Sequence, residues 1–394
     1  MQGSGSLTQM TFLSRRGTIE PIRAIDVMTE AFRLRREGRS VIHLAIGEPS
    51  APTPKLVREA VAAALEHGQI GYTEALGTPP VRTRIAKYYK DTHGLDISPN
   101  RIAVTTGSSA AFNLAFLALF DVGNRVGLPT PGYPAYRNIL KALGLEVVEI
   151  PTTAGTGWNV TPQMLAEVQS QRPLKGLVLA NPNNPNGTMI APEDLRAVVG
   201  ACSDLGIRLI VDEIYHGLVY GFPTETALAF SDEVIVINSF SKYYCMTGWR
   251  IGWMVMPHRM TRAVECLAQN LSLCVNALSQ IAGGAAFDAT DELEAVKARY
   301  AINRTLMLNR LPEIGLDKFH PVDGAFYIYA DVGHLTDDSI GFARQLLAEG
   351  GVAVAPGVDF DGQRGPTHIR LSFAGDQADV EEGLARIGTW LNAG

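Results

Sequence analysis

Three neighbouring apolar runs of the chain end in polar side chains whose types could do chemistry. The run "GLVLA" leads into Asn181-Pro-Asn-Asn-Pro-Asn-Gly187, "RLIV" into Asp212-Glu-Ile-Tyr215, and "VIVI" into Asn238-Ser-Phe-Ser-Lys242. These ends supply an amide cluster, a carboxylate followed by a phenol, and an amine preceded by hydroxyls. In open parallel α/β sheets, ligands bind beyond the carboxyl ends of the strands. We therefore expect the three ends to meet at one site.

Each of these ends also has a simpler interpretation. The Asn-Pro-Gly segment favours a turn, Asp212 could cap a helix, and Lys242 could extend its ammonium group from the surface. A lysine at the end of a buried strand could also be a catalytic amine or a phosphate ligand. The occurrence of all three groups at consecutive strand ends favours a site over three unrelated features.

A fourth element predicts an anion site. In "RIAVTTGSSAAFNLAF" a strand runs into Thr105-Thr-Gly-Ser-Ser109 and then a helix, and small residues at a helix N-terminus let backbone N–H groups reach an anion. Ser108 or Ser109 could instead simply cap the helix. Arg250, in "MTGWR", adds a planar fork that suits a phosphate. A phosphate pocket with an amine, a carboxylate, a phenol and an amide is the set that pyridoxal 5'-phosphate (PLP) requires. No P-loop or dinucleotide motif is present.

The chain resembles the class I aminotransferases (class I/II) among the fold-type I PLP-dependent enzymes. Eight segments carry the resemblance over nearly the whole chain: "LAIGEPS", "GYTEALGTPPVRTRIAKYY", "TGSSAAF", "PGYPAY", "NPNNPNG", "VDEIY", "SFSKYYCMTGWRIGW" and "HIRLSFA". Each segment alone is modest evidence, but all eight in the family's order are very specific. The resemblance implies an α/β fold with a mostly parallel seven-stranded sheet between helices, and a smaller α+β domain from both termini.

The resemblance assigns a role to each candidate residue. It implies that Lys242 forms a Schiff base with the cofactor, that Asp212 lies against the pyridinium nitrogen, and that Tyr215 bonds the ring's 3-oxygen together with Asn184. Burial should lower the pKa of Lys242, so that a neutral amine can take the substrate's Cα proton. The other implied cofactor contacts are Tyr133 stacked on the ring, and Ser108, Ser109, Ser239, Ser241 and Arg250 on the phosphate.

The resemblance also implies the substrate contacts and a partner. Arg370 in "HIRLSFA" would bind the substrate α-carboxylate, beside Asn184 and the backbone of Gly47. Tyr72 in "GYTEALG" would reach the phosphate of the neighbouring subunit, which implies a homodimer. The implied reaction moves an amino group between an L-amino acid and a 2-oxo acid by a ping-pong mechanism. Relatives specialised for acidic substrates carry a lysine where Ser108 stands here, so we expect a neutral aliphatic or aromatic substrate.

A PLP-dependent C–S β-lyase is the alternative function, because such relatives share Asp, Tyr, Lys and Arg at the matching positions. Decarboxylases of this fold commonly carry His immediately before the lysine, where this chain has Ser241. A PLP-binding transcriptional regulator would need an appended DNA-binding domain, for which the segment before Gly47 is too short. An aminotransferase is therefore the preferred interpretation.

Composition limits the other function classes. The 394 residues carry a net charge of -6 without long blocks of one sign, which gives no electrostatic reason to expect nucleic acid or an anionic membrane as partner. The four cysteines show no CxxC spacing and the eight histidines no HExxH pair, so we expect reduced thiols and no metal. The polar start "MQGSGSLTQM" lacks the apolar core of a secretory signal, and the apolar run 110–120 is too short to span a bilayer. We expect a cytoplasmic protein.

The elements that position these groups alternate along the chain. Helical patterns are expected at 22–36, 54–68, 110–120, 134–143 and from Pro192, with Val/Ile/Leu-rich strands between them. Long helical patterns at 258–310 precede a smaller unit with helices at 338–349 and 376–392. We divide the chain into a flexible N-terminal tail (1–18), a large PLP-binding domain (48–286) and a small domain (19–47 and 287–394).

Overall fold

A seven-stranded sheet forms the centre of the molecule. The computed structural model describes residues 13–68 and 70–393, and its large sheet has the strand order β2-β8-β7-β6-β5-β3-β4. Strand β8 runs antiparallel to β2 and β7, while the remaining neighbours pair in parallel. This confirms the predicted mostly parallel sheet. Its strands are β2 (Ile102–Thr105), β3 (Arg125–Thr130), β4 (Glu146–Pro151), β5 (Gly176–Ala180), β6 (Arg208–Asp212), β7 (Ile235–Ser239) and β8 (Gly252–Val255).

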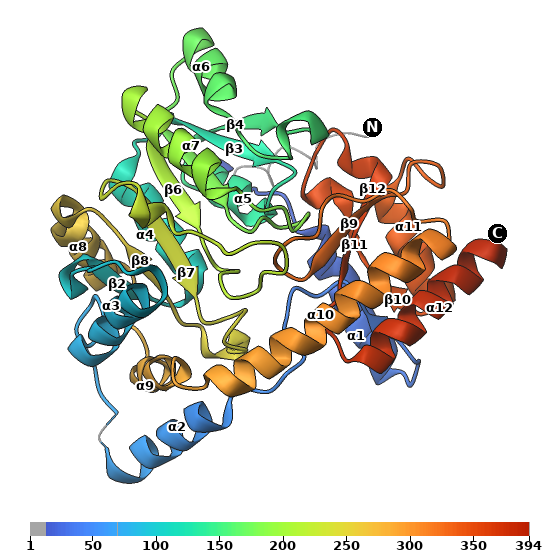
Figure 1. Cartoon of the computed structure of the whole chain (residues 1–394), viewed down its shortest axis with the longest axis horizontal. Helices are drawn as coiled ribbons and strands as arrows, with labels where there is room; N and C mark the ends of the chain where they lie inside the picture. The colour runs from blue at the N-terminus through green and yellow to red at the C-terminus, as the bar shows by residue number, and fades with distance from the viewer. Residues whose placement is uncertain (1–12, 69, 394) are drawn as a thin grey trace, which may run out of the picture.

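Helices cover both faces of this sheet, as Figure 1 shows. In β7, Val236 belongs to one hydrophobic cluster, whereas Ile235 and Ile237 belong to the other. Because side chains alternate across a strand, an unbroken apolar run is the pattern of a strand buried on both faces. One cluster is covered by α2 (Lys55–His67), α3 (Pro79–His93), α6 (Pro162–Gln171), α7 (Pro192–Asp204) and α9 (Ala277–Ala286), and the other by α4 (Gly107–Leu119), α5 (Pro134–Ala142) and α8 (Thr261–Leu271).

A third hydrophobic cluster joins the two ends of the chain. Val27 and Leu34 of α1 (Arg23–Arg36) pack there with residues from Tyr300 to Ile387. The long helix α10 (Thr290–Glu313) contributes Leu293 to a cluster of the large sheet and Tyr300 to this one, and Figure 1 shows it running between the two regions. The other elements here are β1 (Ile42–His43), β9 (Tyr327–Asp331), α11 (Ser339–Gln345), β10 (Val352–Ala353), β11 (Ala355–Pro356), β12 (His368–Ser372) and α12 (Gln377–Ala393).

Two small sheets carry this terminal unit. Strand β1 pairs with β10, which brings the N-terminal part of the chain against residues more than 300 positions later. The second sheet has the order β11-β12-β9 and is antiparallel. Both chain termini therefore build the smaller α+β unit, as predicted.

Several predicted elements differ in extent. The expected strand in "SVIHLAIGEPS" is reduced to Ile42–His43. Leu44 still bonds the backbones of Ala353 and Ser372, and the carbonyls of Ala45 and Gly47 then accept from Arg370 and Lys242. The pattern at 258–310 is divided into three helices, and the helix at 338–349 ends in a π-helical turn at Leu346–Gly350. Helices α3 and α6 were not anticipated. Of the predicted tail, residues 1–12 lie outside the described residues, and Arg15–Gly17 form a short 3-10 turn.

The described helices include none with the length and apolar character needed to cross a membrane. All four cysteines are free thiols, as expected from their spacing.

Candidate active site

The carboxyl ends of β5, β6 and β7 lie side by side in the sheet. Asp212 is the last residue of β6, and Lys242 follows three residues after the end of β7. The two groups are near enough for each charge to influence the other's pKa. The strand ends singled out in the sequence thus meet on one edge of the sheet.

Asp212 is a buried carboxylate, only 3% exposed. Its Oδ2 accepts a hydrogen bond from the Tyr136 hydroxyl, and its Oδ1 accepts one from the Ile214 N–H at 3.1 Å. Burial raises its pKa to about 6, although both hydrogen bonds and the Lys242 amine oppose this rise. The residues after Asp212 form a turn and not a helix, so the helix-cap interpretation is wrong. A nearby cation would favour the ionised form of this carboxylate.

Lys242 is half-buried, and its Nζ donates to the Gly47 carbonyl at 2.5 Å. Burial lowers its pKa to about 8, with further lowering from the Arg370 guanidinium and partial compensation by Glu48. The predicted direction of this shift agrees with the structure. An amine with such a pKa can lose and regain a proton near neutral pH.

Arg370, on β12, brings the smaller unit into the site. Its Nη1 donates to Asn184 Oδ1 at 2.7 Å and its Nη2 to the Ala45 carbonyl at 2.8 Å. The guanidinium lies between two aromatic rings, 4.1 Å from the centroid of Tyr327 and 4.8 Å from that of Phe360. Within the described part of the chain, its buried Nε has no hydrogen-bond partner. An unpaired buried donor costs about 1–3 kcal/mol or more, so an acceptor such as a carboxylate would be stabilised there.

The N-terminus of α4 faces the Arg250 guanidinium. Gly107 opens this helix with φ +72, and a Cβ at this position would lie 2.5 Å from Arg250 Nη2. Thr106, which precedes the helix, caps no N–H with its side chain, and Ser108 and Ser109 lie within the first turn. The simple capping interpretation of these serines is therefore wrong. Free N–H groups, a helix dipole and an arginine together suit a phosphate.

Ser239 and Ser241 are buried next to this helix end. Their hydroxyls lie 3.0 Å apart, and Ser239 Oγ also lies 3.1 Å from the Ile251 carbonyl. Gly252 of β8 lets the start of α4 approach closely, since a Cβ at this position would lie 3.1 Å from the Ser108 N. These contacts place both serines beside the α4 N-terminus, as the predicted phosphate pocket requires.

Two active-site tyrosines were not recognised in the sequence. Tyr136 reaches Asp212 from α5, 76 residues away in the chain. Tyr327, on β9, lies with its hydroxyl 2.9 Å from that of Tyr215. No local pattern identifies these contacts, because Tyr136 and Tyr327 look like ordinary apolar positions of a helix and a strand.

The remaining predicted residues lie at different places. Tyr133 precedes α5 and is half-buried, with its ring 5.3 Å from that of Tyr136. Tyr72 is 86% exposed in this single chain. The structure thus brings Asp212, Lys242, Asn184, Tyr215, Gly47 and Arg370 to one region, whereas Tyr72 lies at the surface.

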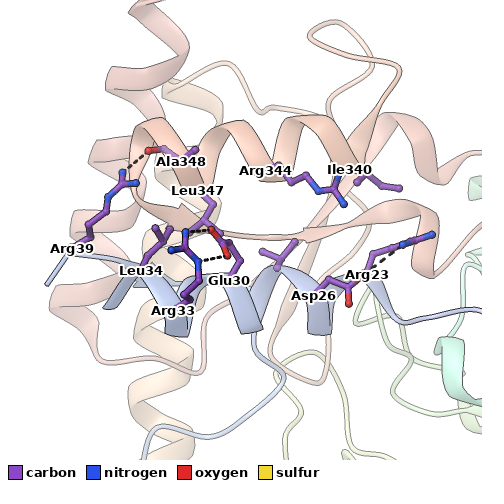
Figure 2. A pocket seen from close by; sticks show the side chains of 11 residues that line it. Arg23, Asp26, Glu30, Arg33, Leu34, Arg39, Ile340, Arg344, Leu347 and Ala348 are labelled. Atoms are coloured by element: carbon purple, nitrogen blue, oxygen red, sulfur yellow. Dashed lines mark hydrogen bonds and ion pairs between the residues drawn. The ribbon is translucent and has the colours of Figure 1, made fainter. Parts of the chain in front are cut away.

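A separate groove lies between α1 and α11, away from these residues. This cavity has a volume of about 530 Å³ and is lined by arginines, acids and apolar side chains such as Leu34, Ile340 and Leu347 (Figure 2). Arg23 pairs with Asp26, and Arg33 pairs with Glu30 of the same helix and with Glu37 just after it. The groove contains none of the candidate catalytic residues.

The assembled side chains fit PLP. A buried carboxylate, a lysine of lowered pKa, and an arginine beside a helix N-terminus match the cofactor's ring nitrogen, aldehyde and phosphate in turn. The orphaned Nε of Arg370 offers a donor for a substrate carboxylate. The seven-stranded sheet with this site defines a PLP-dependent enzyme of fold type I.

Comparison with known proteins identifies the family. The model for "Aminotransferase class I and II" matches residues 39–387. The valine–pyruvate aminotransferase of Mycobacterium tuberculosis is 50% identical over 380 residues, covering 95% of this chain and 97% of that protein. The aspartate/prephenate aminotransferase of Thermus thermophilus is 31% identical over 387 residues, covering 96% and 98%. A crystal structure of an aminotransferase from Mycobacterium tuberculosis has a TM-score of 0.94 at 50% identity and covers 97% of this chain and 99% of that one.

The chain belongs to the class I and II aminotransferases. It is a PLP-dependent enzyme that uses an amino acid and a 2-oxo acid, as the sequence predicted. The C–S β-lyase alternative gains no support from these relatives, whose names describe amino-group transfer.

Proposed function

We propose that this aminotransferase takes an L-amino acid with a neutral aliphatic side chain and passes its amino group to pyruvate. The 50% identical relative from Mycobacterium tuberculosis is named for valine and pyruvate. An aromatic side chain, which the sequence also allowed, is the second choice. The observation that carries the residue roles is the lysine of lowered pKa beside Asp212, with Arg370 close enough to contribute to that shift.

Lys242 acts as the proton carrier in this proposal. Bound PLP supplies an aldehyde for an amine and a protonated ring that withdraws electrons from the substrate's α-carbon. With a pKa of about 8, about one tenth of the Lys242 amines are neutral at pH 7 and can accept a proton at Nζ. The Asp212 carboxylate, held ionised by Tyr136 and the Ile214 N–H, favours a protonated ring nitrogen.

Arg370 and Asn184 bind the substrate carboxylate in this proposal. Their mutual hydrogen bond of 2.7 Å fixes the guanidinium plane and leaves Nε for the ligand. Charge-assisted hydrogen bonds of this kind are stronger than neutral ones. Gly47 contributes its backbone next to the same position, while Tyr215, Tyr133 and the serines with Arg250 hold the cofactor.

The start of α1 and the residue Glu20 before it are tied to elements next to the site. Asp359 accepts the N–H groups of Arg23 and Ala24, each at 2.8 Å, and Asn138 donates to the Glu20 carbonyl at 2.9 Å. Ala24 packs against the cluster that contains Phe360, the ring over Arg370. The start of α1 therefore lies close to Phe360 and Arg370, and the Asp359 carboxylate there is engaged with backbone N–H groups.

A homodimer is part of the proposal. Tyr72 and its neighbour Ile70 are exposed, at 86% and 45%, on a segment that packs against α9 through Gln280. Covering these side chains with a second copy would remove apolar surface from water and bring Tyr72 to the neighbouring phosphate. Light scattering should give twice the 42.5 kDa of one chain. The cytoplasmic location stays a prediction.

The experiment that tests the substrate is a panel of amino donors against pyruvate and 2-oxoglutarate. We expect kcat/KM for valine and similar donors to exceed that for aspartate at least about tenfold, because an acid would leave its second carboxylate without a cation. A preference for aspartate or glutamate would overturn the neutral pocket. Pyruvate released from cystathionine without an added 2-oxo acid would favour the lyase.

A further inference from the structure

Tyr327 occupies the point where the two halves of the site meet. Its side chain is 1% exposed, and its hydroxyl lies 2.9 Å from that of Tyr215. The Arg370 guanidinium lies over its ring at 4.1 Å. A Cβ at Gly47 would lie only 2.2 Å from the Tyr327 hydroxyl. The space that a side chain would need at position 47 is therefore filled by this phenol.

The backbone before Tyr327 is tied to both catalytic loops. The N–H groups of Asp323 and Gly324 donate to the Gly187 carbonyl, at the end of the Asn184 loop, at 3.1 and 2.8 Å. The Ala325 N–H donates to the Leu218 carbonyl, just after Tyr215, at 2.9 Å. These hydrogen bonds thus fix the position of Tyr327 relative to the loops that carry Asn184 and Tyr215, although Tyr327 belongs to the smaller unit.

We propose that Tyr327 is a positioning residue with two separable roles: its hydroxyl orients the Tyr215 hydroxyl toward the cofactor, and its ring supports the plane of Arg370 for the substrate carboxylate. This inference rests on the proposed roles of Tyr215 and Arg370. It explains why position 47 is a glycine, since any larger residue would displace the phenol.

Either hydroxyl can donate in the 2.9 Å hydrogen bond between Tyr215 and Tyr327. Each phenol carries a single proton. Because Tyr215 donates its proton to the oxygen of the cofactor ring in the proposed function, Tyr327 must be the donor to Tyr215. The Tyr215 proton then remains free for the oxygen of the cofactor ring. The hydrogen bond that the Tyr215 hydroxyl accepts from Tyr327 strengthens the hydrogen bond that it donates to this oxygen.

Tyr327→Phe isolates the hydroxyl. A hydrogen bond donated to an oxygen lowers that oxygen's basicity, so a weaker bond from Tyr215 should let Lys242 and the bound cofactor keep their shared proton to higher pH. We expect the pH midpoint of the cofactor absorbance to rise by about half a unit, while KM for the amino donor changes less than about threefold because the ring is retained.

Tyr329→Phe is the matched control. Tyr329 lies two residues along the same strand, is equally buried at 1%, and has its hydroxyl 3.3 Å from the Gly357 carbonyl, away from Tyr215. We expect this variant to keep the wild-type midpoint. An unchanged midpoint in Tyr327→Phe, or an equal shift in Tyr329→Phe, would overturn the role of the hydroxyl.

Tyr327→Leu and Gly47→Ala test the ring and the packing. Loss of the ring from under Arg370 should raise KM about fivefold or more, and an unchanged KM would overturn this second role. Gly47→Ala should shift the midpoint like Tyr327→Phe, and adding Gly47→Ala to Tyr327→Phe should add little, since the atom at 2.2 Å is gone. If the wild-type absorbance does not depend on Lys242 at all, the proposed catalytic roles fail instead, and not only this inference.

Discussion

Two arginine-rich regions of the molecule use the same side chain in opposite ways. In the groove between α1 and α11, Arg33 is 48% exposed at its side chain and pairs with Glu30 of its own helix (Figure 2). It also pairs with Glu37, the residue that follows this helix. In the site, Arg370 is 5% exposed and is held by Asn184, 186 residues away, and by the Ala45 carbonyl.

The two arginines differ in how deeply they are buried and in how their N–H groups are paired. Exposed ion pairs such as those of Arg33 are screened by water and salt, and they contribute little. A buried guanidinium must be almost fully hydrogen-bonded, because leaving a buried charge unpaired is costly. Arg370 nevertheless keeps one N–H without a partner among the described residues. A large cavity therefore does not mark the active site here; an incompletely paired buried charge does.

The largest effect should come from the one amine in the site. Lys242→Ala removes the group that we propose carries the proton, so we expect kcat to fall by about 100- to 10,000-fold or more, with loss of the cofactor absorbance that depends on the amine. Lys87→Ala, on an exposed lysine of α3 paired with Asp91, is the control and should leave kcat unchanged. Normal turnover by Lys242→Ala would contradict the whole assignment.

Exchanging arginine for lysine in both regions tests directly whether burial and pairing distinguish the two arginines. Arg370→Lys keeps the charge but loses the planar fork, so kcat/KM should fall by about 10- to 100-fold, mainly through KM, because each lost charged hydrogen bond is worth about 1.5–3 kcal/mol. Arg33→Lys should leave kinetics and the thermal midpoint unchanged. Equal effects of the two variants would show that burial and pairing do not distinguish the regions.

The smallest effect concerns the hydroxyl that holds Asp212. Tyr136→Phe removes a donor that lowers the pKa of this carboxylate, so that pKa should rise by about one unit. Because the ionised form is the active one, the acid limb of the activity profile should move to higher pH, with a several-fold loss near pH 6 and little change near pH 8. Tyr329→Phe again serves as the control. An acid limb that stays in place would show that Tyr136 does not tune Asp212.

Much of the local chemistry of the candidate site could be predicted from the sequence. The apolar runs before Asp212 and Lys242 predicted buried parallel strands. Because ligands bind at the carboxyl ends of such strands, the sequence also predicted that the two residues lie close together. The small residues at 107–109 predicted the anion site at α4. These features depend on short segments, in which hydrophobic pattern and residue type determine strand, turn and helix start.

Long-range contacts were decided only by the tertiary structure. Nothing near Tyr136 indicates that it meets Asp212, and nothing near Tyr327 indicates that its hydroxyl fills the space left by Gly47. The lowered pKa of Lys242 was expected from burial alone, but its further lowering by Arg370 depends on the smaller unit placing β12 near the Lys242 amine. Side-chain identity specifies what a group can do, whereas its burial, partners and charge surroundings arise from segments that only the packed chain brings together.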